Sequence, residues 1–221
     1  MKREFSNIDV FAIIKELNDV LRKGTISNIY QVEDLLILKI NAIEGNKNLI
    51  IKRDLRINLT QYEYPIPQYP SQYIRNLRKH LRGRRILEVR QYNLDRIVIF
   101  ELSNQGEEPW KFIVELFSRG NYILVDEENI TKIAKSYLQL RNRKIMANKE
   151  YNFPDSYGRN FLEINKQELK ELITEYQDKE IVRILARYIN IAGIYGEEVC
   201  KRAGIEKDRR GSKLNDEEIK E

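Results

Sequence analysis

The feature that most constrains the fold is a change in sequence character near residue 155. Before it, short runs rich in isoleucine, leucine and valine alternate with turn-like stretches, a pattern typical of β-strands. After it, apolar residues recur every three or four positions, which predicts helices. Strands followed by helices predict an α+β protein, with residues 1–158 and 159–221 as two domains. We expect the second, all-helical domain to be truncated, because residues 207–221 resemble a loop that enters a further helix.

Two prominent helices are predicted within the first domain. Ser6 and Asp9 form an S-x-x-D capping box, and the apolar residues that follow, Phe11 among them, continue at helical spacing until Gly24 ends the helix. Three prolines in residues 62–70 predict an extended connector. A second helix follows the connector and ends near Gly83. The remaining runs predict a mixed, mostly antiparallel sheet assembly, with hairpins around residues 93–95 and 118–120.

Composition excludes several classes of protein. Of the 221 residues, 42% are hydrophobic, which is too many for a disordered chain. No apolar run approaches the ~18 residues of a membrane span, and no secretory leader is recognisable at the N-terminus. A single cysteine, Cys200, excludes an intrachain disulfide. We therefore expect a cytoplasmic protein that has no membrane association.

The positive charge is concentrated in one segment. The whole chain carries a net charge of +5, whereas residues 71–96 alone carry +6. A cationic stripe on a helix that is anchored by its apolar face is suited to binding phosphate groups. The alternative is an ordinary solvated helix face. The candidate phosphate-binding residues are Arg75, Arg78, Lys79 and Arg82, which share one helix face at positions i, i+3, i+4 and i+7, and the adjacent Arg84 and Arg85.

No catalytic constellation is recognisable. The chain has one histidine, His80, and it lacks phosphate-binding loops of the G-x-x-x-x-G-K-[ST] and G-x-G-x-x-G types. Paired glutamates lie where turns or helix starts are predicted, and there they need no catalytic explanation. We expect no enzymatic activity, no metal site and no small-molecule cofactor.

Five segments, in order along almost the whole chain, resemble the N-terminal region of the NFACT family. This family includes eukaryotic NEMF and bacterial and archaeal RqcH, and its N-terminal region is often called the fibronectin-binding protein A domain. These segments are FSNIDVFAIIKELN (5–18), RKHLRGRRI (78–86), LDRIVIF (94–100), ELFSRGNYILVD (115–126) and GIYGEEVCKRAGI (193–205).

The resemblance implies a role in ribosome quality control. Members of the family recognise large ribosomal subunits that are obstructed by peptidyl-tRNA, and they position tRNA so that the ribosome adds a C-terminal tail to the stalled chain. Asp95 and Arg96 match the Asp-Arg pair that the family needs for tRNA engagement, and Asp9 matches another position tied to that activity. Arginine and aspartate suit the exposed base edges of a tRNA loop. Without the resemblance, Asp9 is an ordinary helix cap, and Asp95 and Arg96 are an ordinary turn acid and strand-edge cation.

The resemblance also implies that the second domain is of the helix-hairpin-helix type. Gly196 could open a helix there and offer free backbone N–H groups to phosphate; the alternative is a small bundle that packs on the first domain. The first domain would share its fold with formamidopyrimidine-DNA glycosylase. That enzyme class uses an N-terminal proline and a neighbouring glutamate, whereas this sequence has Met1 and Lys2. A DNA glycosylase or lyase and a fibronectin-binding adhesin are the alternative functions.

Overall fold

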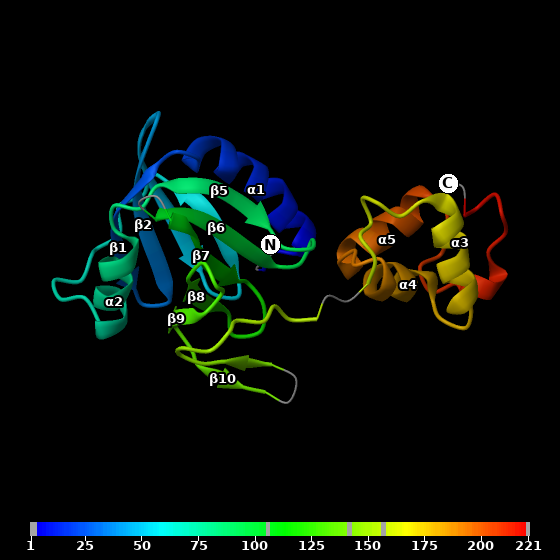
Figure 1. The fold of residues 1–221 in the computed structure, drawn as a ribbon. Coiled ribbons are helices and arrows are strands. Elements are labelled where there is room, and N and C mark those ends of the chain that lie inside the picture. The colour runs from blue at the N-terminus through cyan, green and yellow to red at the C-terminus, as the bar shows by residue number, and fades with distance from the viewer. Residues whose placement is uncertain (1–3, 105–106, 141–142, 156–157, 220–221) are drawn as a thin grey trace. The chain divides into compact units, whose positions relative to one another are not determined.

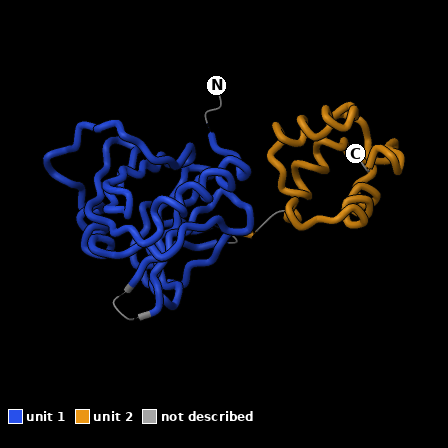
Figure 2. Tube along the Cα trace, turned by 90° about the horizontal axis from the view of Figure 1, so that it is seen from above, with its two compact units in different colours: residues 1–154 blue, residues 155–221 orange. Residues whose placement is uncertain are grey.

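The computed structural model describes residues 4–104, 107–140, 143–155 and 158–219. The chain forms two compact units, residues 1–154 and 155–221 (Figure 2). The boundary therefore precedes the predicted one at 158/159. Phe153 stacks on Tyr92 of the first unit, with 3.9 Å between ring centroids. Gly158 instead lies against Asn190, within the second unit. Residues 156–157, close to the predicted boundary, lie outside the described residues.

Two antiparallel sheets and two helices make up most of unit 1 (Figure 1). The first sheet has the order β1-β2-β3-β4 and the second β5-β6-β7-β8-β9, and β10 and β11 form a separate two-stranded pair. Their bounds are α1 Asn7–Leu21, β1 Thr25–Val32, β2 Leu35–Ala42, β3 Gly45–Lys52, β4 Arg56–Thr60, α2 Gln72–Leu81, β5 Ile86–Gln91, β6 Ile97–Asn104, β7 Glu107–Glu115, β8 Asn121–Val125, β9 Thr131–Ala134, β10 Leu138–Gln139 and β11 Lys144–Ile145. The predicted α+β class with mostly antiparallel sheets is confirmed.

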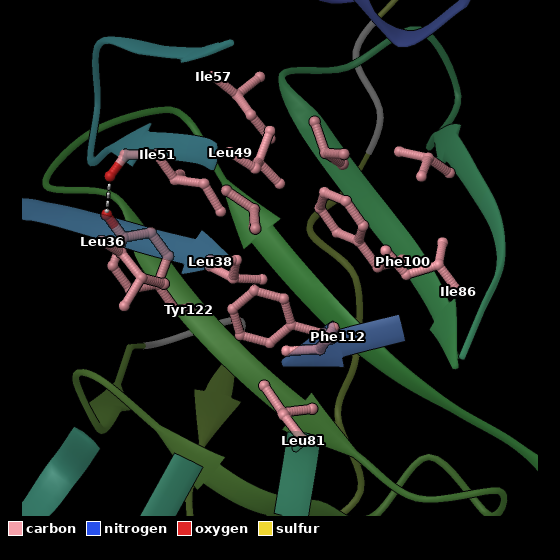
Figure 3. Packing of buried hydrophobic residues seen from close by; sticks show 14 of the residues in the cluster. Leu36, Leu38, Leu49, Ile51, Ile57, Leu81, Ile86, Phe100, Phe112 and Tyr122 are labelled. Carbon is pink, nitrogen blue, oxygen red and sulfur yellow. Dashed lines mark hydrogen bonds between the residues drawn. The ribbon is translucent and has the colours of Figure 1, made fainter. Parts of the chain in front are cut away.

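One hydrophobic core joins the two sheets and both helices. Leu36 and Leu38 from the first sheet and Phe100 and Phe112 from the second belong to the same buried cluster (Figure 3). The Tyr122 hydroxyl on β8 donates a hydrogen bond to the Ile51 carbonyl oxygen on β3, 3.0 Å away, and so links the sheets directly. Several strands are apolar on both faces, because the outer face of each sheet is covered by a smaller cluster.

Helix α1 begins with the predicted capping box. The Ser6 backbone N–H donates to the Asp9 Oδ2 atom at 2.6 Å, and the Asp9 N–H donates to the Ser6 hydroxyl at 3.2 Å. Helix α1 ends at Leu21, before the predicted stop at Gly24, and Lys23 rather than Gly24 adopts the left-handed conformation, with φ 68°. Gly24 serves instead for close packing: a Cβ there would lie 2.9 Å from the Ile40 side chain. Phe11 lies on the outer face of α1 and is 45% exposed.

The predicted hairpins are confirmed. Strands β5 and β6 pair antiparallel, and Asn93 and Leu94 in the turn between them have positive φ values of 42° and 54°. Strands β7 and β8 pair around the second predicted turn. The outer edge of β5 is covered by α1, where the Asn18 side-chain oxygen accepts a hydrogen bond from the Val89 N–H at 2.9 Å.

Unit 2 contains α3 Lys166–Glu175, α4 Ile181–Tyr188, α5 Gly193–Arg202 and a short 3-10 turn at Gly211–Lys213. Its helices enclose a separate buried cluster that includes Ile173, Ile184 and Cys200. Asn165 and Glu168 form a capping box at the start of α3. Across the described part of both units, no helix is long and apolar enough to cross a membrane.

Candidate nucleic-acid interface

Three arginines are fixed against the backbone by the Nε–H groups of their guanidinium side chains. The Nε–H of Arg78 donates to the Ile29 carbonyl oxygen at 2.7 Å, and that of Arg82 donates to the Ser27 oxygen at 3.2 Å. Both acceptors are on β1, the edge strand of the first sheet. Arg85 donates in the same way to the Lys23 oxygen at 3.1 Å, just before that strand. We refer to Arg78, Arg82 and Arg85 as the arginine row.

This mode of attachment leaves the charge of the row available. A guanidinium has five N–H donors, and an Nε contact uses only one of them, so the terminal NH₂ groups can still form a fork for an oxyanion. Arg82 and Arg85 are exposed, and Arg78 is half-buried with its guanidinium 4.8 Å above the Tyr30 ring centroid. The anchors also reduce the rotamer freedom that an arginine would lose on binding a ligand.

The other predicted phosphate-binding residues differ in how they are held. Arg84 serves the packing of unit 1: its Nε–H donates to the His80 carbonyl oxygen at 2.5 Å, and its guanidinium lies 4.3 Å above the Trp110 ring. Arg75 is exposed and is tied to Gln72 and to the Pro70 carbonyl oxygen. Lys79 is exposed. Burial, and then the nearby charges of Lys79 and Arg84, lower the pKa of His80, so it adds no positive charge at neutral pH.

Some basic residues elsewhere in the chain are paired with acids. In unit 2, Lys170, Arg183 and Arg202 form ion pairs with Asp216, Glu180 and Glu198, at 2.7, 2.7 and 2.8 Å. By contrast, none of the ion pairs among the described residues involves Arg75, Lys79 or a member of the arginine row. Arg75, Lys79 and the arginine row therefore carry a positive charge that no ion pair neutralises in the part of the chain that the structure describes, which favours a polyanionic partner.

The second predicted site lies at the tip of the β5–β6 hairpin. Asp95 is held in the turn, where its backbone N–H donates to the Tyr92 oxygen at 2.7 Å. The Gln91 side-chain amide donates both to the Asp95 oxygen, at 2.8 Å, and to the Asn7 oxygen, at 2.9 Å. The hairpin tip is thereby tied to the first turn of α1, where Asp9 lies. Arg96 is half-exposed, with its guanidinium 3.6 Å from the Glu4 carboxylate.

The structure brings Asp9, Asp95 and Arg96 to one end of α1 but places the arginine row at the other end. Arg85 precedes β5 and lies beside the C-terminus of α1, whereas the hairpin tip follows β5. The six-residue strand β5, at about 3.3 Å per residue, places Arg85 roughly 20 Å from the hairpin tip. Asp9 also has the structural role that its capping box predicts. The sequence thus predicts two sites, and they lie on one unit but apart from each other.

The prediction that Gly196 opens a helix is wrong. Helix α5 begins at Gly193, and the Gly196 N–H donates to the Ala192 carbonyl oxygen at 3.1 Å. That N–H is therefore not available to a phosphate group. Gly196 is buried where α5 crosses α4, and a Cβ built there would lie 3.5 Å from the Val182 carbonyl oxygen. At that distance a Cβ would make ordinary van der Waals contact, so Gly196 lies in the contact between the two helices without being required by it.

Residues 6–221 match the family described as NFACT N-terminal and middle domains. The chain belongs to the NFACT family. Its family relatives include the archaeal Rqc2 homolog aRqcH of Methanocaldococcus jannaschii, 31% identical over 231 residues that cover all of this chain and 34% of the relative. They also include the human ribosome quality control complex subunit NEMF, 34% identical over 131 residues that cover 59% of this chain and 12% of the relative. The chain thus spans about a third or less of these two proteins.

Two solved structures share the fold of this chain. The N-terminal domain of the fibronectin-binding protein PavA from Streptococcus pneumoniae superposes with a TM-score of 0.78 at 26% identity, covering 90% of this chain and 83% of that one. The N-terminal part of the fibronectin/fibrinogen-binding protein from Streptococcus suis gives a TM-score of 0.80 at 25% identity, covering 92% and 81%.

Proposed function

We propose that this chain is the tRNA-binding module of a ribosome quality-control factor. In this role the whole protein recognises large ribosomal subunits that are obstructed by peptidyl-tRNA and positions tRNA for C-terminal tailing of the stalled chain. The relatives named as subunits or homologues of the ribosome quality control complex support the setting. The chain acts in the cytosol, and it acts by binding: peptide bonds are formed by the ribosome.

One observation carries the RNA-binding part of this proposal. The arginine row is anchored through Nε–H groups to backbone carbonyl oxygens, and no ion pair among the described residues neutralises it. Arginines that recognise phosphate use their terminal NH₂ groups, and an Nε–H anchor leaves these groups available. The row therefore supplies the affinity that does not depend on base sequence, through contacts with the phosphate backbone and release of counterions.

The hairpin tip supplies discrimination between tRNAs. Arg96 can stack on an exposed base or donate a fork of hydrogen bonds to it, and Asp95 can accept hydrogen bonds from base amino groups. Both residues are at the end of a rigid hairpin that Gln91 ties to α1. With about 20 Å between the tip and the row, one folded RNA can contact both, with its backbone at the row and a loop at the tip.

The test is a titration of this chain with total tRNA and with random-sequence duplex DNA at two salt concentrations. We expect wild type to prefer tRNA and to keep that preference at higher salt. We expect Asp95→Ala/Arg96→Ala to lose the preference while retaining most of the affinity, because the row is intact. Equal binding of tRNA and DNA by wild type, fading together with salt, would show that the chain only clamps phosphate and would contradict the tRNA-specific proposal.

A second candidate function is suggested by the solved structures named as fibronectin-binding proteins. If this chain binds fibronectin, surface plasmon resonance with immobilised fibronectin will give saturable binding at physiological salt that tRNA does not abolish. We expect instead only weak binding that salt removes, because an exposed cationic surface attracts many acidic proteins without specificity. Saturable, salt-resistant binding would favour the adhesin function.

A further inference from the structure

A cavity of about 330 Å³ lies at the end of the arginine row, between the end of β1, the proline-containing connector and the start of α2. Its lining includes Tyr30, Tyr69, Arg78 and Lys135. The volume is at the lower end of the range for small-molecule sites. Because Arg78 belongs both to the row and to the cavity wall, a strand whose backbone follows the row along β1 leads to the cavity.

Two cations converge on this cavity without a carboxylate bound to either. The Lys135 ammonium group on the chain after β9 donates to the Gln31 side-chain oxygen at 3.2 Å and lies 4.8 Å from the centroid of the Tyr73 ring. Gln31 is fixed in turn, because its amide nitrogen donates to the Glu33 backbone oxygen at 2.7 Å. Burial, and then the charge of Arg53, lower the pKa of Lys135. An anion in the cavity would offset that cost of desolvation.

The aromatic residues of the cavity have different roles. The Tyr30 ring already lies beneath the Arg78 guanidinium, 4.8 Å from its centroid, and its hydroxyl accepts a hydrogen bond from the Asn28 side chain at 2.8 Å. Tyr69 is 80% exposed and makes no ring contact with any other residue that the structure describes. Pro67 and Pro70 flank it and restrict the connector. Tyr69 therefore presents an exposed ring to a planar ligand from a restricted segment of backbone.

The lining also includes one acidic residue, Glu33. A site for inorganic phosphate or for a phosphorylated side chain gains nothing from a carboxylate in its wall. A ribonucleotide does, because its ribose hydroxyls and base amino groups are donors that a carboxylate accepts. Two cations, one acid and an open aromatic ring match the three parts of a nucleotide.

We propose that this cavity binds a single unpaired ribonucleotide, with its phosphate at Arg78 and Lys135 and its base on Tyr69. The inference rests on the proposed function in one respect: the nucleotide would belong to the RNA that the arginine row holds. Because stacking of a base on an aromatic side chain is worth about 1–3 kcal/mol, Tyr69 makes a substantial contribution, and Arg78 couples the cavity to the row.

The probe is 2-aminopurine riboside 5′-monophosphate, whose fluorescence changes on stacking, titrated with the whole chain. We expect saturable quenching, weakened about tenfold in Tyr69→Ala and also in Lys135→Gln. The riboside without phosphate should bind more weakly than the monophosphate. Tyr62→Ala is the matched control, because Tyr62 is an exposed tyrosine of the same connector outside the cavity lining. Thermal unfolding of each variant shows whether its fold is intact.

Three results would overturn the proposal: no quenching by wild type, quenching that Tyr69→Ala and Tyr62→Ala lower equally, or tighter binding of a phosphotyrosine peptide than of the nucleotide. The proposed tRNA-binding function and the nucleotide site can fail independently of each other. If the nucleotide binds as expected but tRNA shows no preference over duplex DNA, the cavity stands and the tRNA module does not. If tRNA is preferred but the nucleotide does not bind, the proposed tRNA module stands and the nucleotide site is contradicted.

Discussion

Replacing Glu115 by alanine is expected to lower the free energy of unfolding of unit 1 by about 3–5 kcal/mol, because it leaves a buried guanidinium without its partner. Glu115 ends β7 and is only 3% exposed. Its carboxylate pairs with Arg143 and accepts a hydrogen bond from the Tyr151 hydroxyl at 2.8 Å. Arg143 also donates to the Asn152 oxygen at 2.8 Å. The pair therefore holds residues 143–153 against the outer face of the second sheet.

Urea unfolding followed by tryptophan fluorescence will measure this loss, because Trp110 packs against the core of unit 1. The control is Glu88→Ala, which removes the carboxylate of a half-exposed ion pair with Arg90, 3.9 Å apart. We expect that control to leave the stability nearly unchanged. Glu115→Gln should fall between the two, because it keeps an acceptor for Tyr151 but loses the charge. A loss for Glu115→Ala no larger than that of the control would contradict the structural role of the pair.

The second large effect concerns RNA affinity. We expect Lys79→Ala/Arg82→Ala/Arg85→Ala to weaken tRNA binding roughly 100-fold near physiological salt. The reason is that each phosphate contact that is lost reduces the magnitude of the slope of log K against log salt by about 0.9. Fluorescence anisotropy at about 50 and 200 mM salt should therefore show a slope smaller by about 3. All three side chains are exposed, and none joins an ion pair among the described residues, so the fold should tolerate the change.

A matched control separates a local interface from net charge. Lys170→Ala/Arg183→Ala/Arg202→Ala removes the same charge from unit 2, where each residue pairs with an acid. We expect a loss of only a few fold, because these three residues belong to unit 2 and not to the arginine row of unit 1. If the control weakens tRNA binding as much as the first triple variant, overall charge governs affinity and the arginine row is not the interface.

The sequence predicted local features well. The S-x-x-D capping box and the two hairpin turns depend on residues within a few positions of one another, and each is present. Phe11 and Gly24 show the limit of such patterns. Phe11 shares the apolar helical spacing of α1 but is exposed, and neighbouring Val10 is the buried residue. The left-handed residue after α1 is Lys23, while Gly24 is required by its close packing on β2.

The candidate sites depended on contacts between distant segments. The arginine stripe was recognisable from its helical spacing, but its anchors were not, because Arg82 and Ser27 are 55 positions apart. Gly196 was misplaced because its burial depends on Val182 and Leu185 of another helix. Tyr69 and Lys135 had no sequence signal as a pair. They meet only when β1, the connector and the chain after β9 come together.

The position of the arginine row also has a consequence for how the protein can change during evolution. An edge strand with free carbonyl groups is a template on which other chains can add a strand and aggregate. On β1, Arg78 and Arg82 donate hydrogen bonds to the carbonyl oxygens of Ile29 and Ser27, respectively. By covering these acceptors, Arg78 and Arg82 would hinder the addition of another strand at this edge, in addition to any contact with RNA. A mutation that removes either residue would therefore expose a carbonyl oxygen on this edge as well as remove a positive charge.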